Sequence, residues 1–180
     1  MRLRRFTAAD VDALAALHGD AAVMRYIDDG RPVPRSTVEQ ETLPGILREY
    51  STLPAGQGQF AAEAPGFVGW FSLKPAHGPG LDPADIELGY RLLPSAWGRG
   101  LATAGARLLV RRAFTELDLR KVVATTMAVN AGSRRVLEKA GLRHVDTFFH
   151  DWPDPIPGTE HGDVVYAVTR DEWLQENVTK

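Results

Sequence analysis

Cysteine is absent from this 180-residue chain. Without it the chain cannot form disulfides, thiolate metal sites or a thiol nucleophile, and such a composition fits a reducing compartment. Long apolar runs are also missing, so no segment is predicted to span a membrane. The chain begins with basic residues, as a secretory signal does, but Asp10 and Asp12 interrupt it before an apolar run can form. We therefore expect a cytoplasmic protein.

An excess of charge of one sign is missing as well. The 21 basic and 23 acidic residues leave a formal net charge of −2. This balance argues against a nucleic-acid partner and against attraction to anionic membranes. The length is typical of one domain, and we expect a single domain over residues 1–180.

The hydrophobic patterns predict a mixed α/β fold. A short strand at 2–6 precedes a helix that starts at the capping box Thr7–Asp10, and a second capping signal, Ser36 with Glu39, starts a helix that Pro44 must kink or split. The segments rich in branched and aromatic residues predict strands at 58–65, 66–76, 85–93, 121–129, 144–150 and 164–169. Further helices are expected at 98–117, at 130–141 and after Thr169. This order favours a central mixed, mostly antiparallel sheet flanked by α-helices.

The stretch PSAWGRGLATAGARLLV places a glycine-rich turn at the start of a helix. Unpaired N–H groups and the helix dipole make such a start suitable for binding a phosphate, although glycines can also serve only the turn itself. The dinucleotide fingerprint lacks its third glycine here, and Glu116 and Asp118 fall before the next strand rather than at its end. A Walker loop is absent. Both common nucleotide-binding folds therefore fit badly.

Two motifs in sequence order carry a family resemblance. The segment IELGYRLLPSAWGRGLATAGARLLV, followed by VNAGSRRVLEKAGL, resembles the GNAT superfamily of N-acetyltransferases, and most of all its RimJ/RimL-type protein N-terminal acetyltransferase branch. The family loop Q/R-x-x-G-x-G/A corresponds to Trp97, Gly100 and Ala102, with Trp in place of Gln or Arg. The second motif matches from Asn130 to Leu142, and the resemblance covers almost the whole chain.

The resemblance implies acetyl-CoA as cosubstrate and no metal. Its pantetheine arm would pair with backbone groups of Leu92 and Leu93, and a backbone N–H near Leu92 would stabilise the oxyanion. Asn130 would face the same arm, a role compatible with capping the helix that follows it. The residues expected to hold the pyrophosphate are Gly98, Arg99, Gly100, Leu101, Ala102 and Thr103. Trp97 and Ser133 complete the expected cofactor-binding set.

Two side chains are candidates for proton transfer. Glu87 shares one face of its strand with Arg91, so it is either the general base, acting through water, or a member of a structural ion pair. The tyrosine that many family members use to protonate the thiolate corresponds to Leu137, so Ser133, one turn earlier, is the candidate substitute. Ser133 is equally suited to the helix cap, and the thiolate can also leave without an acid.

The resemblance points to a primary amine as acceptor, attacked directly in a ternary complex, and neither a Cys nor an activated Ser is visible as a covalent nucleophile. Tyr26, His150 and Trp152 are candidates for lining the acceptor pocket. His144, His150 and His161 match no metal-ligand spacing. The alternatives are a CoA-binding sensor or scaffold without catalysis and, less compatible with the charge, a nucleic-acid-binding module. A homodimer is compatible with the resemblance.

Overall fold

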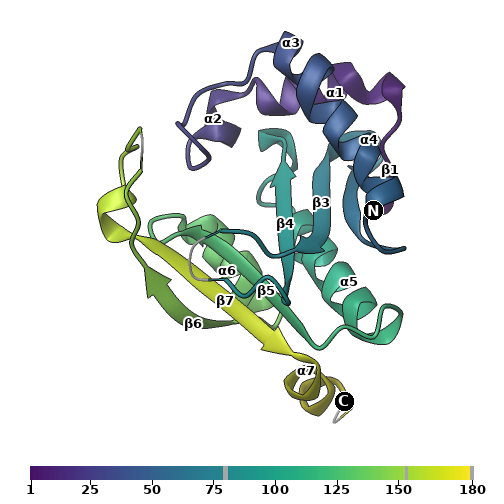
Figure 1. Cartoon of the computed structure of the whole chain (residues 1–180), viewed down its shortest axis with the longest axis vertical. Coiled ribbons are helices and arrows are strands. Elements are labelled where there is room, and N and C mark those ends of the chain that lie inside the picture. The colour runs from purple at the N-terminus through teal and green to yellow at the C-terminus, as the bar shows by residue number, and fades with distance from the viewer. Residues whose placement is uncertain (79–80, 153, 179–180) are drawn as a thin grey trace. The chain divides into compact units, whose positions relative to one another are not determined.

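The computed structural model describes residues 1–78, 81–152 and 154–178 and divides into two compact units (Figure 1). The first unit comprises Met1–Lys74 and Gly89–Ala102, and the second comprises Pro75–Leu88 and Thr103–Lys180. Strand β4 (Ile86–Leu92) starts in the second unit and ends in the first, whereas helix α5 (Leu101–Thr115) starts in the first and continues in the second.

The first unit contains the strand order β1-β2-β3-β4. Strands β1 (Arg2–Arg5), β2 (Gly58–Glu63) and β3 (Phe67–Pro75) pair antiparallel, as the short connections predict. The helices at its start are η1 (Ala8–Asp10), α1 (Val11–His18) and α2 (Ala21–Met24). Its core joins residues distant in sequence, namely Phe6, Leu14, Val38, Leu43, Ile46 and Ala61.

The helical path over residues 35–52 changes type along its length. It begins as α3 (Arg35–Thr37), widens to the π-helical η2 (Val38–Thr42) and continues as α4 (Leu43–Thr52). The predicted cap at Ser36 is wrong, because Pro34 is the N-cap and makes no side-chain cap bond. Pro44 lies in the first turn of α4, just after the π-helical stretch, and the helical path continues past it to Thr52 without a break, so the predicted split is not seen and the kink stays a prediction.

The second unit contains the strand order β4-β5-β7-β6. Strand β5 (Lys121–Met127) pairs parallel with β4 through Ile86 and Glu87, and antiparallel with β7 (Asp163–Thr169), which pairs antiparallel with β6 (Arg143–Phe148). The helices of this unit are α5, α6 (Ala131–Lys139), η4 (Thr159–His161) and α7 (Arg170–Val178). The predicted mixed, mostly antiparallel sheet with helices is confirmed.

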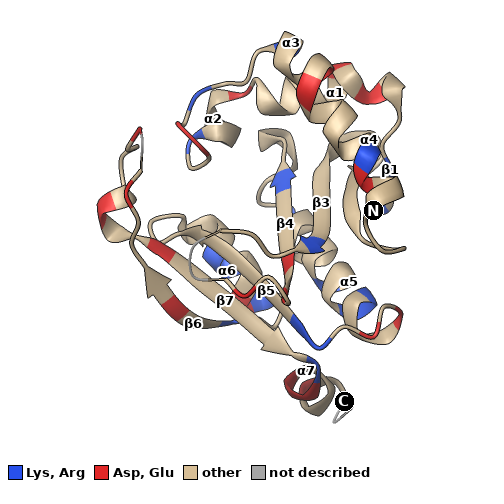
Figure 2. Ribbon diagram, viewed as in Figure 1, with Lys and Arg blue, Asp and Glu red and all other residues tan. Residues whose placement is uncertain are grey.

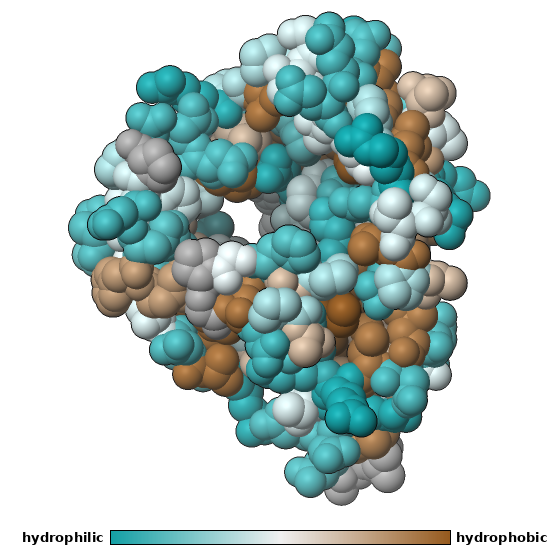
Figure 3. Space-filling model, in the orientation of Figure 1, coloured by the Kyte–Doolittle hydropathy of each residue, from teal (hydrophilic) through white to brown (hydrophobic). Residues whose placement is uncertain are grey.

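Strand β6 is the last in its strand order, and its side chains are mostly exposed. Figure 3 shows brown, hydrophobic surface over β6 and the segment that follows it. Val145 and Phe149 account for exposed hydrophobic side chains there, being 58% and 69% exposed.

Local capping follows the sequence closely. The Thr7 backbone N–H donates to Asp10 Oδ2 over 2.7 Å, and the Thr169 backbone N–H donates to Glu172 Oε2 over 2.8 Å, so both capping boxes are confirmed. Gly141 follows α6 with a φ of +94°, a backbone conformation that suits glycine at the end of a helix.

Candidate active site

The glycine turn before α5 is exposed and open. Gly98 and Gly100 have φ of +69° and +74°, which explains glycine at both positions. A Cβ built on either glycine would meet no atom within 4 Å, so the backbone here can be approached closely from outside. The turn leads into the 15-residue helix α5, whose first N–H groups lack intrahelical acceptors. This combination suits the binding of an anionic group such as a phosphate.

Trp97 ties this turn to the end of β4. Its indole Nε1 donates to the Leu92 carbonyl over 2.8 Å, while about half of the side chain remains exposed. The next residue, Leu93, donates its N–H to the Val68 carbonyl of β3 over 2.9 Å. Because successive residues of a strand direct their N–H groups to opposite edges, the Leu92 N–H faces the edge away from β3.

Glu87 lies near the start of β4 and contacts the neighbouring strand β5. Its Oε1 accepts a hydrogen bond from Thr125 Oγ1 over 2.9 Å. The side chain is half-buried, and Glu87 pairs in register with Val123, two residues before Thr125. In Figure 2 β4 carries a red segment near its start and a blue one near its end, which correspond to its only acidic and basic residues, Glu87 and Arg91.

Side-chain hydrogen bonds fix the start of helix α6. The Asn130 side-chain oxygen accepts from the Ser133 backbone N–H over 3.1 Å, which confirms Asn130 as the N-cap. Arg134 donates to the buried Tyr166 hydroxyl over 3.1 Å and to the Ala128 carbonyl over 3.1 Å. These bonds position Ser133 one turn before Leu137, which is buried and has no acidic proton.

His150 lies between two aromatic rings in the segment after β6. Its ring stacks on Phe148 at 5.7 Å and contacts Trp152 at 4.6 Å between centroids. Its Nδ1 is 3.6 Å from Asp163 Oδ2, and burial raises the pKa of Asp163 while the charge of His150 opposes that shift. Figure 2 marks this unit's acidic residues in red. Two of the three acceptor-side candidates, His150 and Trp152, are therefore in contact.

Tyr26, the third acceptor-side candidate, belongs to the first unit. It is partly buried, and the guanidinium of Arg25 lies over its ring at 5.0 Å from the centroid. Tyr26 lies two residues after the buried Met24, the last residue of α2. The structure thus places it next to an element that packs into the first unit's interior.

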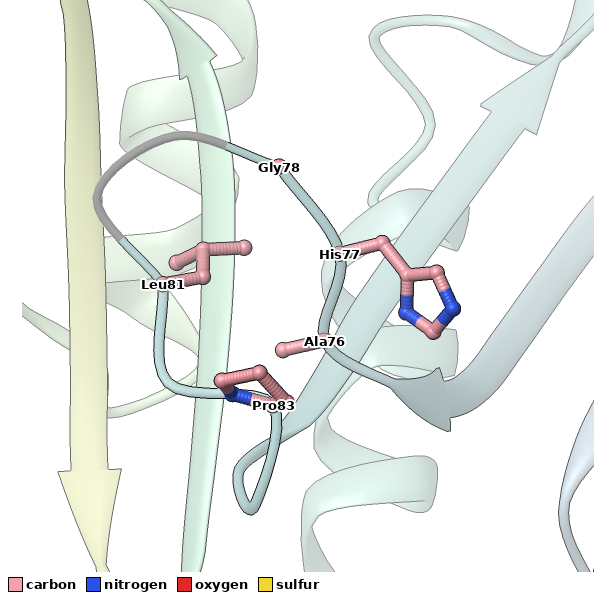
Figure 4. A pocket seen from close by; sticks show the side chains of 5 residues that line it. All are labelled: Ala76, His77, Gly78, Leu81 and Pro83. Atoms are coloured by element: carbon pink, nitrogen blue, oxygen red, sulfur yellow. The ribbon is translucent and has the colours of Figure 1, made fainter.

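A small hollow of about 260 Å³ lies in the loop between β3 and β4. Figure 4 shows Ala76, Leu81 and Pro83 at this loop and the His77 ring turned away from them. None of the predicted site residues lines it.

Over the described residues, no three His, Asp or Glu side chains converge as a metal site. None of the described helices combines the length and apolar character needed to cross a bilayer.

Three comparisons bear on this arrangement. A family model described as "Acetyltransferase (GNAT) domain" matches residues 1–143. The chain belongs to the GNAT acetyltransferase family. An FsC-acetyl coenzyme A-N(2)-transacetylase of Aspergillus fumigatus is 40% identical to this N-acetyltransferase over 161 residues, which cover 87% of this chain and 68% of the relative.

Solved GNAT structures have the same fold. An acetyltransferase of Bacillus anthracis matches with a TM-score of 0.72 at 21% identity and covers 94% of each chain. The structure of AAC(6')-Ib in complex with ribostamycin and coenzyme A matches with a TM-score of 0.75 at 24% identity and covers 97% of this chain and 96% of that chain. At these identities the likeness shows the fold alone.

The predicted site residues of this GNAT enzyme fall in both units. The first unit holds Tyr26, Leu92, Leu93 and residues 97–102, and the second holds Glu87, Thr103, Asn130, Ser133, His150 and Trp152. Sequence reasoning did not find Thr125 as the partner of Glu87 or Asp163 as that of His150. A threonine inside an apolar strand is a weak signal for the first pair, and no signal points to the second.

Proposed function

We propose that this GNAT enzyme transfers the acetyl group of acetyl-CoA to a primary amine by direct attack in a ternary complex, and that it belongs to the RimJ/RimL-like branch. The family and the 40% identical transacetylase support the donor, since that relative's name includes acetyl coenzyme A. The branch rests on the two motifs around Gly100 and Asn130. The absence of cysteine supports transfer without an acyl-enzyme.

The observation that carries this proposal is the open glycine turn at the start of α5. Gly98 and Gly100 leave free space where a side chain would stand. The backbone N–H groups of residues 98–103 can then bind the pyrophosphate directly, assisted by the helix dipole. The exposed Arg99 adds a positive charge inside the same turn.

The end of β4 is proposed to hold the pantetheine arm and the thioester. The Leu93 N–H and the Leu92 carbonyl already have partners in Val68 and Trp97. The Leu93 carbonyl also has a partner, since it accepts from the Ala96 N–H over 2.9 Å. The group proposed for the donor is therefore the Leu92 N–H. The Leu92 N–H would stabilise the oxyanion that forms when the amine adds to the thioester carbonyl.

Glu87 is proposed as the general base. The acceptor arrives as an ammonium and must lose a proton before its nitrogen can attack. The hydrogen bond from Thr125 orients the Glu87 carboxylate, which is proposed to take the proton through a water molecule. The C–N bond then forms, the C–S bond breaks, and the thiolate takes a proton from Ser133 or from solvent.

The acceptor side is proposed to involve Tyr26, His150 and Trp152. All three are partly buried and carry aromatic or imidazole rings, which suits contacts with an organic amine. The solved relative with ribostamycin and the FsC transacetylase are named for different acceptors, so the acceptor of this enzyme is a separate question.

A thiol-release assay tests the proposal. Purified protein is incubated with acetyl-CoA and a panel of amines that includes N-terminal peptides, amino acids, polyamines and aminoglycosides. We expect CoA release that depends on both protein and amine. Tight CoA binding by calorimetry with no release for any amine would favour a CoA-binding sensor, and absence of CoA binding would contradict the proposal altogether.

A further inference from the structure

Arg91 is a mostly buried cation near the end of β4 in the first unit. Its NH1 lies 3.3 Å from the Met24 sulfur of α2, and its guanidinium lies 5.3 Å from the ring centroid of Trp70 on β3. Both neighbours are uncharged. Thioether sulfur is a weak acceptor, and a cation–π contact only partly replaces the hydration that the guanidinium loses.

The guanidinium has no carboxylate partner in the first unit, all of whose residues are described. No Asp or Glu oxygen of that unit lies within 4.0 Å of it, and the charge of Asp28 acts only from a distance. The Arg91 Nε is buried without a hydrogen-bond partner. Burial lowers the pKa of Arg91 to about 10, so the side chain is still charged at neutral pH. Buried charges are normally paired, because an unpaired one is costly.

The surroundings fix the arginine in place. Trp70 Nε1 donates to His18 Nε2 over 3.2 Å, which orients the ring beneath the guanidinium. Burial, with the charge of Arg91, lowers the pKa of His18 to about 4, so His18 is neutral and adds no second cation. A Cβ on Gly89 would meet Ser72 Oγ at 2.6 Å, and the Trp70 ring lies next to the same position at 3.4 Å, so glycine here leaves room for the Ser72 hydroxyl beside the ring.

The position along β4 connects this cation to the proposed chemistry. Arg91 lies on the part of β4 that belongs to the first unit. It directly precedes Leu92, the proposed oxyanion donor. Met24 brings the end of α2 to the same guanidinium. An acceptor that is only cationic would be repelled here, whereas a carboxylate on the acceptor would pair with the guanidinium.

We propose that Arg91 is a specificity-determining residue that binds a carboxylate carried by the acceptor amine, so that the substrate class is an amino acid or an amino-acid-like amine. This inference rests on the proposed acetyl transfer. The carboxylate of the acceptor would supply the negative charge that the first unit does not place beside the buried guanidinium of Arg91.

Matched amine pairs test this inference. Phenylalanine and 2-phenylethylamine differ only in the carboxylate, and ornithine and putrescine form a second such pair. For the wild type we expect a kcat/KM that favours the carboxylate member. In Arg91→Gln that preference should fall by about 10-fold to 100-fold, which corresponds to one charge-assisted hydrogen bond, and Arg91→Lys should retain part of it. Arg5→Gln is the control, since Arg5 also lies over an aromatic ring, Tyr50, at 4.9 Å.

A binding measurement decides the matter independently of turnover. The Trp70 indole N–H signal, assigned by its loss in Trp70→Phe, is followed by NMR during titration with each amine. We expect a saturable shift with phenylalanine or ornithine, none with the decarboxylated partners, and none in Arg91→Gln. Equal responses within each pair, or no response at all, would overturn the inference even if CoA is released.

The donor side provides the remaining distinction. The CoA Kd of Arg91→Gln should equal that of the wild type. A large increase in that Kd would assign the guanidinium to the donor and overturn the inference while leaving acetyl transfer intact. Absence of CoA binding by the wild type would contradict the proposed function, and the indole titration would still decide the role of Arg91.

Discussion

Replacement of Gly100 by valine tests whether the turn before α5 binds phosphate or only reverses the direction of the chain. The φ of Gly100 is +74°, and nothing lies within 4 Å of the Cβ position. The Cβ of a valine has room there, so the main cost expected in the free protein is backbone strain of roughly 1–2 kcal/mol. For a chain of this size, that strain lowers the Tm by roughly 2–8 °C.

The effect on CoA affinity is expected to exceed this general strain. A side chain at position 100 stands where the pyrophosphate must approach the backbone N–H groups. Loss of one charge-assisted hydrogen bond removes roughly 1.5–3 kcal/mol, so we expect the CoA Kd of Gly100→Val to rise roughly 10-fold to 150-fold. Isothermal titration calorimetry with CoA measures the Kd, and a thermal melt measures the strain.

Gly78→Val is the matched control. Gly78 has a φ of +112° and also has nothing within 4 Å of its Cβ position, but it lies in the loop between β3 and β4. We expect it to lower the Tm without changing the CoA Kd. If Gly100→Val binds CoA as well as the wild type, or if both variants lose affinity equally, the turn before α5 does not bind the phosphates and the reasoning fails.

Three further variants probe the site and the fold. Glu87→Gln should keep the CoA Kd but lower kcat roughly 100-fold, most strongly at low pH where amine deprotonation limits, and an unchanged pH–rate profile would remove Glu87 as the base. Asn130→Ser should keep the helix cap and the Tm but raise the KM for acetyl-CoA, while Asn130→Ala should also lose about 1 kcal/mol of stability in a melt. An unchanged KM in both would leave Asn130 as a cap only. The pKa of His18 is lowered from 6.5 to about 4, so the unfolded chain binds an extra proton between these values and stability should fall as pH drops through that window, by up to about 3 kcal/mol. Urea unfolding of His18→Gln should lack this part of the pH dependence, and an identical pH dependence would contradict it.

Short sequence patterns at helix ends predicted much of the local structure. The capping boxes at Thr7 and Thr169, the cap at Asn130 and the glycine at 141 depend on residues within a few positions of one another, and the structure confirms all four. The capping signal at Ser36 was misleading because Pro34 fixes an earlier start. A two-residue pattern cannot rank competing starts that lie so close together.

Contacts between residues distant in the chain could not be predicted from the sequence. Thr125 and Glu87 are 38 positions apart and meet only because β4 and β5 pair in parallel with one register. His18, Trp70 and Arg91 come from a helix and two strands. The sequence pattern offered Glu87 as the partner of Arg91, whereas the contacts of Arg91 in its own unit are Met24 and Trp70. Such pairs depend on register and packing rather than on spacing along the chain.

The most direct test of the central claim follows the acetyl group itself. Acetyl-CoA labelled with ¹³C at the thioester carbonyl is incubated with the protein and a primary amine, and the carbonyl signal is recorded in real time by NMR. The account predicts that the thioester signal is replaced by an amide carbonyl signal at a rate that depends on enzyme and amine. A thioester signal that persists with every amine, or that converts only to free acetate, would contradict it.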